Sequence, residues 1–495
     1  MGAILRCGFR AREVRGWRAT RTRSEGGVGA YACGRRARRW GYSCGVLRRG
    51  LMAMGVVGLL VVGVGWASAA PSRWSTPGLL AGRTSSLQYP VAVRVDSSQS
   101  VASWASARGV FAAVAGSTGR FGPPQRLSAT GLRHAVAHRE PFAIIQDLAS
   151  DARGDAIVVW DRITRISPAS AFGGLLHASY RPAGGRFGSA HLIARHVGRA
   201  MVGMDGRGNA TIAWAQTDGP GARSIDVVER ASSGRYGPVG VLANGAAGFV
   251  SGIAVNHAGD AVVVWNSNEP GASGMGIMAA TRERNGPFGS PVPITSPRPG
   301  AIVGSVGIDN AGQALIAWAG PNDAAKGQSF THVTPLQTGA TTAGPAQTLR
   351  APGMRPTAIG DLNGLPLIDV NAAGDAIVTW GSTGHDRATE SLVVARRAPG
   401  RPFGTGVTIG TLKSEGTFDS AIGPKGDAIV AWDNPRAPVR AALASSARSP
   451  FGHAVTLAPK SEDSAIPAAG IGPHARAITI WSDLPKSRLQ YAIAR

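Results

Sequence analysis

Hydrophobic residues along this chain gather into short runs that recur at a nearly constant interval. Eight of these runs end in tryptophan, and their tryptophans lie roughly fifty residues apart. Copies of the repeated phrase read DARGDAIVVW, DGRGNATIAW, NHAGDAVVVW, DNAGQALIAW and NAAGDAIVTW. The eight residues are Trp104, Trp160, Trp214, Trp265, Trp318, Trp380, Trp432 and Trp481. A repeat of this length is typical of stacked supersecondary units, so the pattern predicts one repeat architecture over most of the chain.

The repeat between residues 143 and 194 shows which elements each unit contains. AIIQDLAS and AIVVW are separated by the turn sequence DARGD, LLHASYR follows, and GGRFGSAHLIA leads through glycine into a last apolar segment. We expect Asp151 to accept backbone N–H groups and Gly154 to adopt a left-handed conformation, as in a type I turn with a glycine bulge. After residue 70 no amphipathic helical period of useful length appears. The repeat therefore predicts four antiparallel strands per unit.

Four-stranded units repeated radially predict an all-β fold, a β-propeller with eight four-stranded blades. Seven blades is the alternative, if the first repeat, with its abbreviated turn at 96–99, is absorbed elsewhere. The repeated tryptophans are expected to be buried between neighbouring sheets.

The two ends of the repeat region predict how the ring closes. The eighth repeat stops after its third strand, RLQYAIAR at 488–495. Near the other end, Trp74 is followed six residues later by Leu80, as Phe121 is followed by Leu127. We therefore predict that residues 72–81 complete the last blade with an N-terminal strand, which leaves no unpaired sheet edge at the closure.

A second marker, an aromatic residue followed by glycine, precedes the fourth strand of six repeats. The aromatic residues are Phe121, Phe187, Tyr236, Phe288, Phe403 and Phe451, which we expect to pack over the outer strands. The phrase GGRFGSAHLIA resembles the turn and strand of the Asp-box (sialidase-like) propellers, whose motif reads Ser-x-Asp-x-Gly-x-Thr-Trp. Here Phe or Tyr replaces the Trp, and the motif Asp is missing from every copy. The resemblance implies a propeller fold and carbohydrate chemistry, but the family's catalytic Arg, Tyr, Glu and Asp residues match no positions in this chain.

The N-terminal residues differ from the repeat region. Residues 1–45 are rich in Arg and Gly, and we interpret them as a non-native or extended n-region. Residues 46–70 contain the apolar run LMAMGVVGLLVVGVGW followed by Ala67-Ser68-Ala69, which predicts a signal peptide cleaved near Ala69. An uncleaved membrane anchor and a twin-arginine signal are the alternatives. Residues 71–495 are then a single exported domain, secreted or at the cell surface.

Charge and cysteine content narrow the choice of partners. The formal net charge is +23, and the first 50 residues hold 13 Arg and two Glu, so the exported chain stays basic. A basic surface suits an anionic partner, but no basic cluster is interleaved with aromatic residues, which argues against nucleic acid. Cys7, Cys33 and Cys44 all precede the expected cleavage point, so we expect no disulfide in the exported chain. We predict a monomer without a cofactor.

Polar residues in the variable loops are the candidate ligand-binding residues, because variable loops on a rigid scaffold often carry function. They are Arg133, His134, His138, Arg139, Asp161, Arg162, Asn266, His385, Asp386, Asp433, Asn434 and Asp483. The alternative is that they are ordinary solvated loop ends. His134 and His138 have no third ligand that can be named, so no metal site is predicted. Asp147, Asp369 and Asp419 lie on or near innermost strands, but the sequence does not show which carboxylates meet.

Three functions are compatible with these features. The first is an exported, non-catalytic propeller that binds a glycan or a protein, favoured because no catalytic motif is present. The second is a polysaccharide-acting hydrolase or lyase of sialidase-like type, which a convergent pair of carboxylates and an Arg in the central channel would favour. The third is a structural envelope protein held in the membrane by an uncleaved N-terminal segment.

Overall fold

The computed structural model describes only part of the chain, and each element in that part is a β-strand. The chain divides into two compact units, Met1–Ala67 and Ser68–Arg495, and the described residues belong to the second. They are 74–82, 87–95, 99–106, 108–128, 142–163, 174–217, 223–245, 247–267, 274–284, 286–298, 300–321, 328–355, 357–358, 365–384, 390–413, 416–458, 464–473, 476–483 and 485–494. No helix in these ranges is long and apolar enough to cross a membrane. The expected signal peptide lies outside them.

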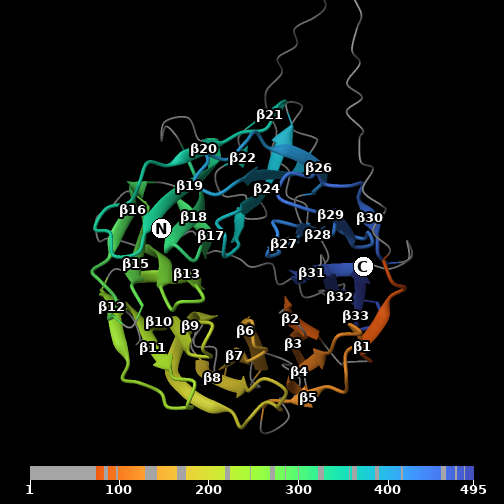
Figure 1. The fold of residues 1–495 in the computed structure, drawn as a ribbon, viewed down its shortest axis with the longest axis horizontal. Coiled ribbons are helices and arrows are strands. Elements are labelled where there is room, and N and C mark those ends of the chain that lie inside the picture. The colour runs from red at the N-terminus through yellow and green to blue at the C-terminus, as the bar shows by residue number, and fades with distance from the viewer. Residues whose placement is uncertain are drawn as a thin grey trace, which may run out of the picture. The chain divides into compact units, whose positions relative to one another are not determined.

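The first two sheets hold the first three repeats (Figure 1). One sheet contains β2 (Leu87–Val95), β3 (Ser100–Ser106), β4 (Gly109–Ala115) and β5 (Gln125–Arg126). The next is seven-stranded and contains β6 (Phe142–Ser150), β7 (Ala156–Ile163), β8 (Gly174–Arg181), β9 (His191–Met204), β10 (Ala210–Thr217), β11 (Arg223–Arg230) and β12 (Gly240–Asn244). All of these pairings are antiparallel, and the four strands expected between residues 143 and 194 are confirmed.

Four further sheets follow in chain order, again with antiparallel strands. The first has β13 (Ala247–Val255), β14 (Ala261–Ser267), β15 (Met275–Arg282) and β16 (Val292–Arg298). The next has β17 (Ile302–Ile308), β18 (Gln313–Gly320), β19 (Gln328–Gln337) and β20 (Gln347–Leu349), with β22 (Thr357–Ala358) paired to β19. Then come β21 (Met354–Arg355), β23 (Leu367–Val370), β24 (Ala376–Gly384), β25 (Glu390–Arg397) and β26 (Val407–Thr411). The fourth has β27 (Phe418–Ile422), β28 (Ala428–Trp432), β29 (Arg440–Ala444) and β30 (Val455–Thr456).

The last sheet joins both ends of the repeat region. It contains β31 (Ser464–Ile471), β32 (Ala477–Asp483), β33 (Arg488–Ala494) and the N-terminal strand β1 (Gly78–Ala81). β1 runs antiparallel to β33, with Gly78 opposite Tyr491. The backbone N–H of Ser75 extends this pairing by donating to the Ile493 carbonyl at 2.8 Å.

The second and third repeats differ from the expectation of separate four-stranded blades. They share β9, whose first half pairs with β8 and whose second half pairs with β10. The two halves meet near His196, which has a φ of 57°. No loop separates the fourth strand of one repeat from the first strand of the next here, so the hydrogen-bonded ladder continues through both repeats.

The first strands of successive repeats contact one another in a continuous circuit. We call this set the inner ring, and it comprises β2, β6, β9, β13, β17, β23, β27 and β31. The circuit returns from β31 to β2, so the last repeat contacts the first. The fold is therefore all-β and propeller-like, with the first strands innermost (Figure 1).

The hairpin turn between the first two strands has the predicted geometry. Asp151 Oδ1 accepts the backbone N–H groups of Arg153 at 3.0 Å and Asp155 at 2.9 Å. Gly154 has a φ of 93°, a region that favours glycine. The same pattern recurs at Asp205, Asn256, Asp309 and Asn371, because each is followed by a glycine three residues later, whereas the seventh turn begins with Gly423.

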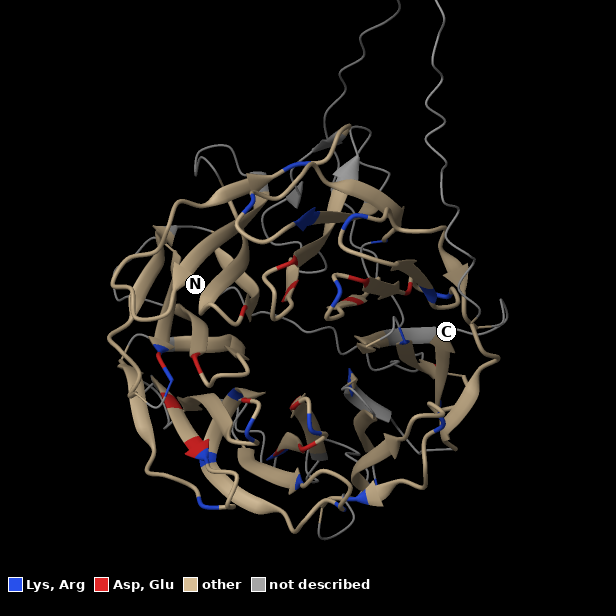
Figure 2. Cartoon of the chain, viewed as in Figure 1, with Lys and Arg blue, Asp and Glu red and all other residues tan. Residues whose placement is uncertain are grey.

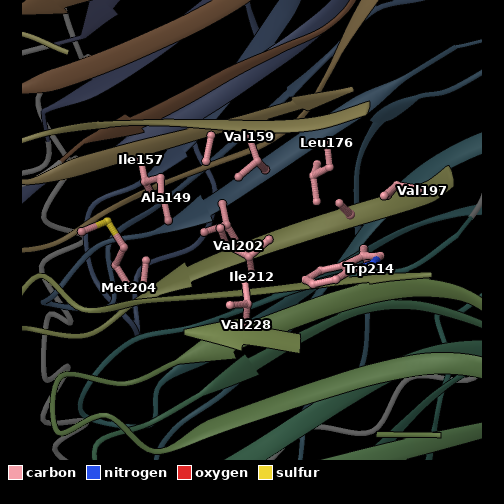
Figure 3. Packing of buried hydrophobic residues seen from close by; sticks show 13 residues of the cluster. Ala149, Ile157, Val159, Leu176, Val197, Val202, Met204, Ile212, Trp214 and Val228 are labelled. Carbon is pink, nitrogen blue, oxygen red and sulfur yellow. The ribbon is translucent and has the colours of Figure 1, made fainter. Parts of the chain in front are cut away.

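The eight repeated tryptophans are buried, as predicted, with at most 5% of any one exposed. Trp214 shows how they pack (Figure 3). It lies in a cluster with Ile157 and Leu176 from the second repeat and Val202 and Ile212 from the third. The other seven tryptophans likewise lie in clusters formed by residues of their own repeat and of the repeat before it in the ring.

The aromatic–glycine marker is also structural. Phe187 is buried, and the side-chain amide of Gln125 in the preceding repeat accepts its N–H at 3.0 Å and donates to its carbonyl at 2.6 Å. Gln347 makes the same pair of bonds to Phe403. The marker therefore ties the outer part of one repeat to the repeat before it.

Part of the positive charge is internal. Arg181, Arg230 and Arg282 lie near the ends of third strands and are buried. Arg181 donates to the carbonyl of Gly154 at 2.8 Å, and the Arg230 guanidinium lies 3.6 Å from the centre of the Tyr180 ring. These arginines brace the repeats, so net charge alone overstates how basic the surface is.

Candidate functional site

Six of the twelve loop residues predicted to bind a ligand lie outside the described residues. They are Arg133, His134, His138, Arg139, His385 and Asp386. The other six are placed, and their contacts show what each side chain does in the fold.

Three of these six brace the backbone of loops or neighbouring strands. Asn266 is buried, donates to the Ala301 carbonyl at 3.1 Å and accepts the Val303 N–H at 3.3 Å, both in the next repeat. Asp433 accepts both the N–H and the hydroxyl of Thr417. Asn434 accepts the N–H of Lys413 at 2.7 Å and donates to the Thr411 carbonyl at 3.0 Å.

The remaining three are charged residues at the ends of second strands. Asp483 is fully buried and pairs with Arg488 at 2.7 Å, which neutralises it within its own repeat. Asp161 is 2% exposed, and its Oδ1 has no hydrogen-bond partner. Burial raises the pKa of Asp161 to about 7. Arg162 is partly buried on the same strand, and its Nε also has no partner.

A different set of charged residues lies on the inner ring, and Figure 2 shows red and blue segments at the inner ends of several sheets. Arg94 is on β2, Asp147 on β6, Arg199 on β9, Asp369 on β23 and Asp419 on β27. They therefore come from five different repeats, which the circuit of first strands brings to one rim.

Asp147 is tied to the next repeat and faces Arg94. Its Oδ2 accepts the N–H of Val202 at 3.1 Å, its Oδ1 accepts that of Leu148 at 2.8 Å, and Arg94 Nη2 lies 3.7 Å away. Solvent reaches 15% of the Asp147 side chain. Burial nevertheless raises the pKa of Asp147, against the opposing effects of Arg94 and the backbone donors.

Ser420 joins the other two carboxylates. Its Oγ donates to Asp369 Oδ2 at 2.6 Å, and its backbone N–H donates to Asp419 Oδ1 at 3.0 Å. Asp419 Oδ2 also accepts the N–H of Ala469 in the next repeat at 2.8 Å. Burial raises the pKa of Asp369 to about 7, and the charge of Asp419 adds to this effect. Burial also raises the pKa of Asp419.

Arg94 connects the two parts of the rim. Its side chain is 48% exposed, and its charge lowers the pKa of Asp147, Asp369 and Asp419 alike. A guanidinium carries five N–H donors. Within the described ranges, the contacts of Arg94 are an ion pair with Asp147 at 3.7 Å and a hydrogen bond to the Val93 carbonyl at 3.1 Å. The Arg94 guanidinium and the three carboxylates therefore provide hydrogen-bond donors and acceptors on the inner ring. The described residues hold no group of three side chains suited to a metal ion.

Two of these carboxylates stand at the same position relative to the repeated tryptophan. Asp147, Ser305 and Asp419 each stand thirteen residues before the tryptophan of their repeat. Each accepts an N–H from the next inner-ring strand, from Val202, Ile368 and Ala469 respectively. Asp147 and Asp419 thus hydrogen-bond one inner-ring strand to the next. Asp369 and Arg94 do not stand thirteen residues before a repeated tryptophan. Sequence reasoning noted the three carboxylates without pairing them and did not single out Arg94, Arg199 or Ser420.

No protein-family model and no curated protein sequence matches the chain. Solved structures do match. An ulvan lyase, a polysaccharide lyase of family PL25 bound to -[GlcA(1-4)Rha3S]-, has a TM-score of 0.46 at 11% identity over 73% of this chain and 93% of its own. The NanB sialidase of Streptococcus pneumoniae has a TM-score of 0.37 at 9% identity over 83% and 69%. The GH93 α-L-arabinofuranosidase of Fusarium graminearum has 0.38 at 9% over 71% and 93%. All three TM-scores are below 0.5, and the Asp-box resemblance stays a prediction.

Proposed function

We propose that this protein is an exported β-propeller that binds a carbohydrate at its inner ring. The observation that carries the proposal is the set of charged side chains on the inner ring, where Arg94 lies 3.7 Å from Asp147 and where Asp369 and Asp419 stand on two further strands. A sugar hydroxyl both donates and accepts hydrogen bonds, so a set of side chains that includes a guanidinium and carboxylates can bind it. Guanidinium groups alone would only donate hydrogen bonds, and ionised carboxylates alone would only accept them.

We propose that the protein is an eight-bladed propeller in which the second and third blades share β9. Pairing of β1 with β33 and the contact of β31 with β2 support closure of the ring by the N-terminal strand. We propose export on the sequence features of residues 46–70, with cleavage near Ala69. N-terminal sequencing of the protein from culture medium and from membranes tests this, and an intact segment in membranes would favour an anchored envelope protein.

A thermal-shift screen of the purified protein against neutral, acidic and amino oligosaccharides tests the binding proposal. A ligand at 100 times its dissociation constant adds about 2.7 kcal/mol of stability, which a melting curve detects. We expect one sugar class to raise the melting temperature of the wild type and to raise that of Arg94→Ala clearly less. An unchanged melting temperature with all three classes contradicts carbohydrate binding.

A polysaccharide-acting enzyme is the second candidate, and two acids on adjacent inner-ring strands, Asp369 on β23 and Asp419 on β27, favour it. A carboxyl with a pKa of about 7 can give a proton to a leaving group, and a neighbouring carboxylate can assist. Product analysis of each oligosaccharide that shifts the melting temperature tests this candidate. Cleavage that is lost in Asp369→Asn would establish it, and an intact ligand after prolonged incubation would leave a binding protein.

A further inference from the structure

Two kinds of turn lie side by side at one end of the sheets. One joins the first and second strands of a repeat and comprises 151–155, 205–209, 256–260, 309–313, 371–375 and 423–427. The other joins the third and fourth strands and follows β4, β8, β11, β15, β25 and β29. The two kinds meet in three repeats, where Asp155, Asn209 and Asp260 each accept a backbone N–H of the third-to-fourth turn at 2.8 Å. We call the surface that these turns form the hairpin face.

The turns of successive repeats are also joined to one another. The backbone N–H of Gly206 donates to the His257 carbonyl at 3.1 Å, which links the third repeat to the fourth. The backbone N–H of Asn310 donates to the Ala372 carbonyl at 3.1 Å, which links the fifth repeat to the sixth. Side chains that stand on turns of neighbouring repeats therefore lie on one surface.

An exposed arginine stands in the third-to-fourth turn of six repeats. Its place varies, because Arg120 directly precedes Phe121 whereas Arg448 stands three residues before Phe451. The aromatic residue and the glycine after it, which pack, keep one spacing. The six are Arg120, Arg186, Arg235, Arg284, Arg401 and Arg448. None of them forms an ion pair with an acid of the described ranges. These repeats therefore have in common an exposed positive charge, and not a packing position for it.

The acids of the hairpin face are directed into the turns. Asp205 is buried, and its Oδ1 accepts two backbone N–H groups of its own turn, both at 2.9 Å. Asp309 is buried and does the same. In the described ranges the exposed acids at this end of the sheets are Glu229 and Glu283, and Glu229 pairs with buried Arg282. The exposed charge of the hairpin face is therefore mainly positive.

We propose that the hairpin face binds an acidic polysaccharide, whose sulfate or carboxylate groups pair with arginines of several repeats at once. The planar guanidinium matches two oxygens of such a group. A single exposed ion pair contributes little, so binding requires a polymer that reaches several repeats. The inference goes beyond the proposed function, because it places a second ligand on residues outside the inner ring.

The side chains of these turns favour a soluble polymer over other anionic partners. Proteins that lie on a membrane surface use apolar side chains as well as cations. The exposed large hydrophobic side chains of the described ranges belong to strands or lie next to one, and none stands in these turns. Single-stranded nucleic acid is bound by stacking its bases on exposed aromatic rings, whereas Phe187 and Phe403 at the hairpin face are buried.

Binding of the purified protein to dextran sulfate, with uncharged dextran of the same length as the control, tests the proposal. We expect binding to the sulfated polymer alone, and an affinity that falls as salt is added because exposed ion pairs are screened. A short sulfated oligosaccharide should bind at least tenfold more weakly than the polymer, since it reaches fewer repeats. Absence of binding to dextran sulfate, or equal affinity for the short oligosaccharide, contradicts the proposal.

Two double variants separate the hairpin face from the general positive charge of the protein. Arg186→Gln with Arg235→Gln removes two exposed charges from this face. Arg108→Gln with Arg195→Gln is the matched control, because it removes two exposed charges from the opposite ends of the sheets. We expect the first variant to weaken polymer binding about tenfold and the control to stay within about twofold of the wild type. Equal weakening would show that the polymer responds to net charge alone, and the proposal would be wrong.

Two further measurements separate this inference from its alternatives. Vesicles of phosphatidylglycerol and phosphatidylcholine in equal parts should bind more weakly than dextran sulfate, and tight binding to vesicles alone would assign a membrane partner and overturn the proposal. Arg94→Ala should bind dextran sulfate as the wild type does, because Arg94 stands on the inner ring. Polymer binding that is lost in Arg94→Ala and kept in the hairpin-face variant would also overturn the proposal. Failure of the oligosaccharide screen removes the inner-ring function and leaves this result unchanged.

Discussion

Val95 in the first repeat packs against Gly470 in the last, by the same contact that Val255 makes with Gly203. A Cβ atom added at Gly470 would lie 2.8 Å from Val95 Cγ2, and one added at Gly203 would lie 2.5 Å from Val255 Cγ2. The first and last repeats thus fit together as repeats adjacent in sequence do. Close packing of this kind leaves no room for an extra methyl group.

Replacing Gly470 by Ala should destabilise the protein by roughly 1–3 kcal/mol, because the new Cβ would force the two first strands apart. Urea denaturation measures the effect. Gly116→Ala is the matched control, since no atom lies within 4 Å of a Cβ at that position. Equal stability of the two variants would show that the contact between the last and first repeats is loose.

Deletion of residues 71–82 should lower the melting temperature of the whole repeat unit in one cooperative transition. The deletion removes β1 and exposes the edge of β33, and it also takes away Leu80, which is buried against Tyr491 and Ile493. Differential scanning calorimetry records the transition. A melting temperature equal to that of the intact chain would mean that the N-terminal strand does not hold the ring together.

Trp214→Ala should cost about 3–5 kcal/mol, because it empties the centre of the cluster shared by the second and third repeats. Trp74→Ala provides a comparison, since Trp74 is only partly buried and should cost less. Chemical denaturation of both variants measures the difference. Similar losses at the two positions would contradict a special packing role for the repeated tryptophans.

The sequence predicted those parts of the fold that depend on local pattern. Trp214 and its seven counterparts marked the second strand of each repeat, and Gly154 marked a turn whose left-handed φ the structure contains. The pairing of residues near 78–81 with the last strand followed from counting strands. The continuous β9 was not predicted, because the absence of a loop at His196 leaves no strong turn signal.

The candidate site was harder to predict because it depends on contacts between repeats. Asn266 and Asp433 have the polarity of binding residues, yet they bond to the backbone of loops and strands. Ser420 carries no sequence signal of its own, and its importance comes from Asp369, which stands on the preceding first strand. Aligning positions on the repeated tryptophan would have found the bracing acids, since Asp147 and Asp419 share the same offset.

Asp161→Asn should stabilise the protein at pH 8 by about 1–3 kcal/mol, because it removes a buried carboxylate whose Oδ1 has no hydrogen-bond partner. Asn266 occupies the equivalent position after its tryptophan, where its amide donates to the Ala301 carbonyl and accepts the Val303 N–H. Thermal melts of Asp161→Asn and of Asn266→Asp should therefore shift in opposite directions at pH 8. Shifts in the same direction would contradict the role of burial at this position.

The stabilisation by Asp161→Asn should depend on pH. The folded-state pKa of Asp161 is about 7, above its ordinary value of 3.8, so between these values the folded protein binds more protons than the unfolded chain. The contribution of Asp161 to stability therefore falls as pH rises through this window and is constant above it. Melting temperatures measured from pH 5 to pH 8 should converge for wild type and Asp161→Asn at the acidic end. A constant difference across the window would exclude titration of this group.

Calorimetric titration of wild type, Arg94→Ala and Arg162→Ala with the oligosaccharide identified by thermal shift tests the central claim most directly. Arg94 stands on the inner ring, whereas Arg162 stands near the variable loops, so the pair separates the two locations. We predict that Arg94→Ala weakens binding at least tenfold, or about 1.4 kcal/mol, and that Arg162→Ala binds as the wild type does. Loss of binding in Arg162→Ala with full affinity in Arg94→Ala would contradict the account and place the ligand at the loops.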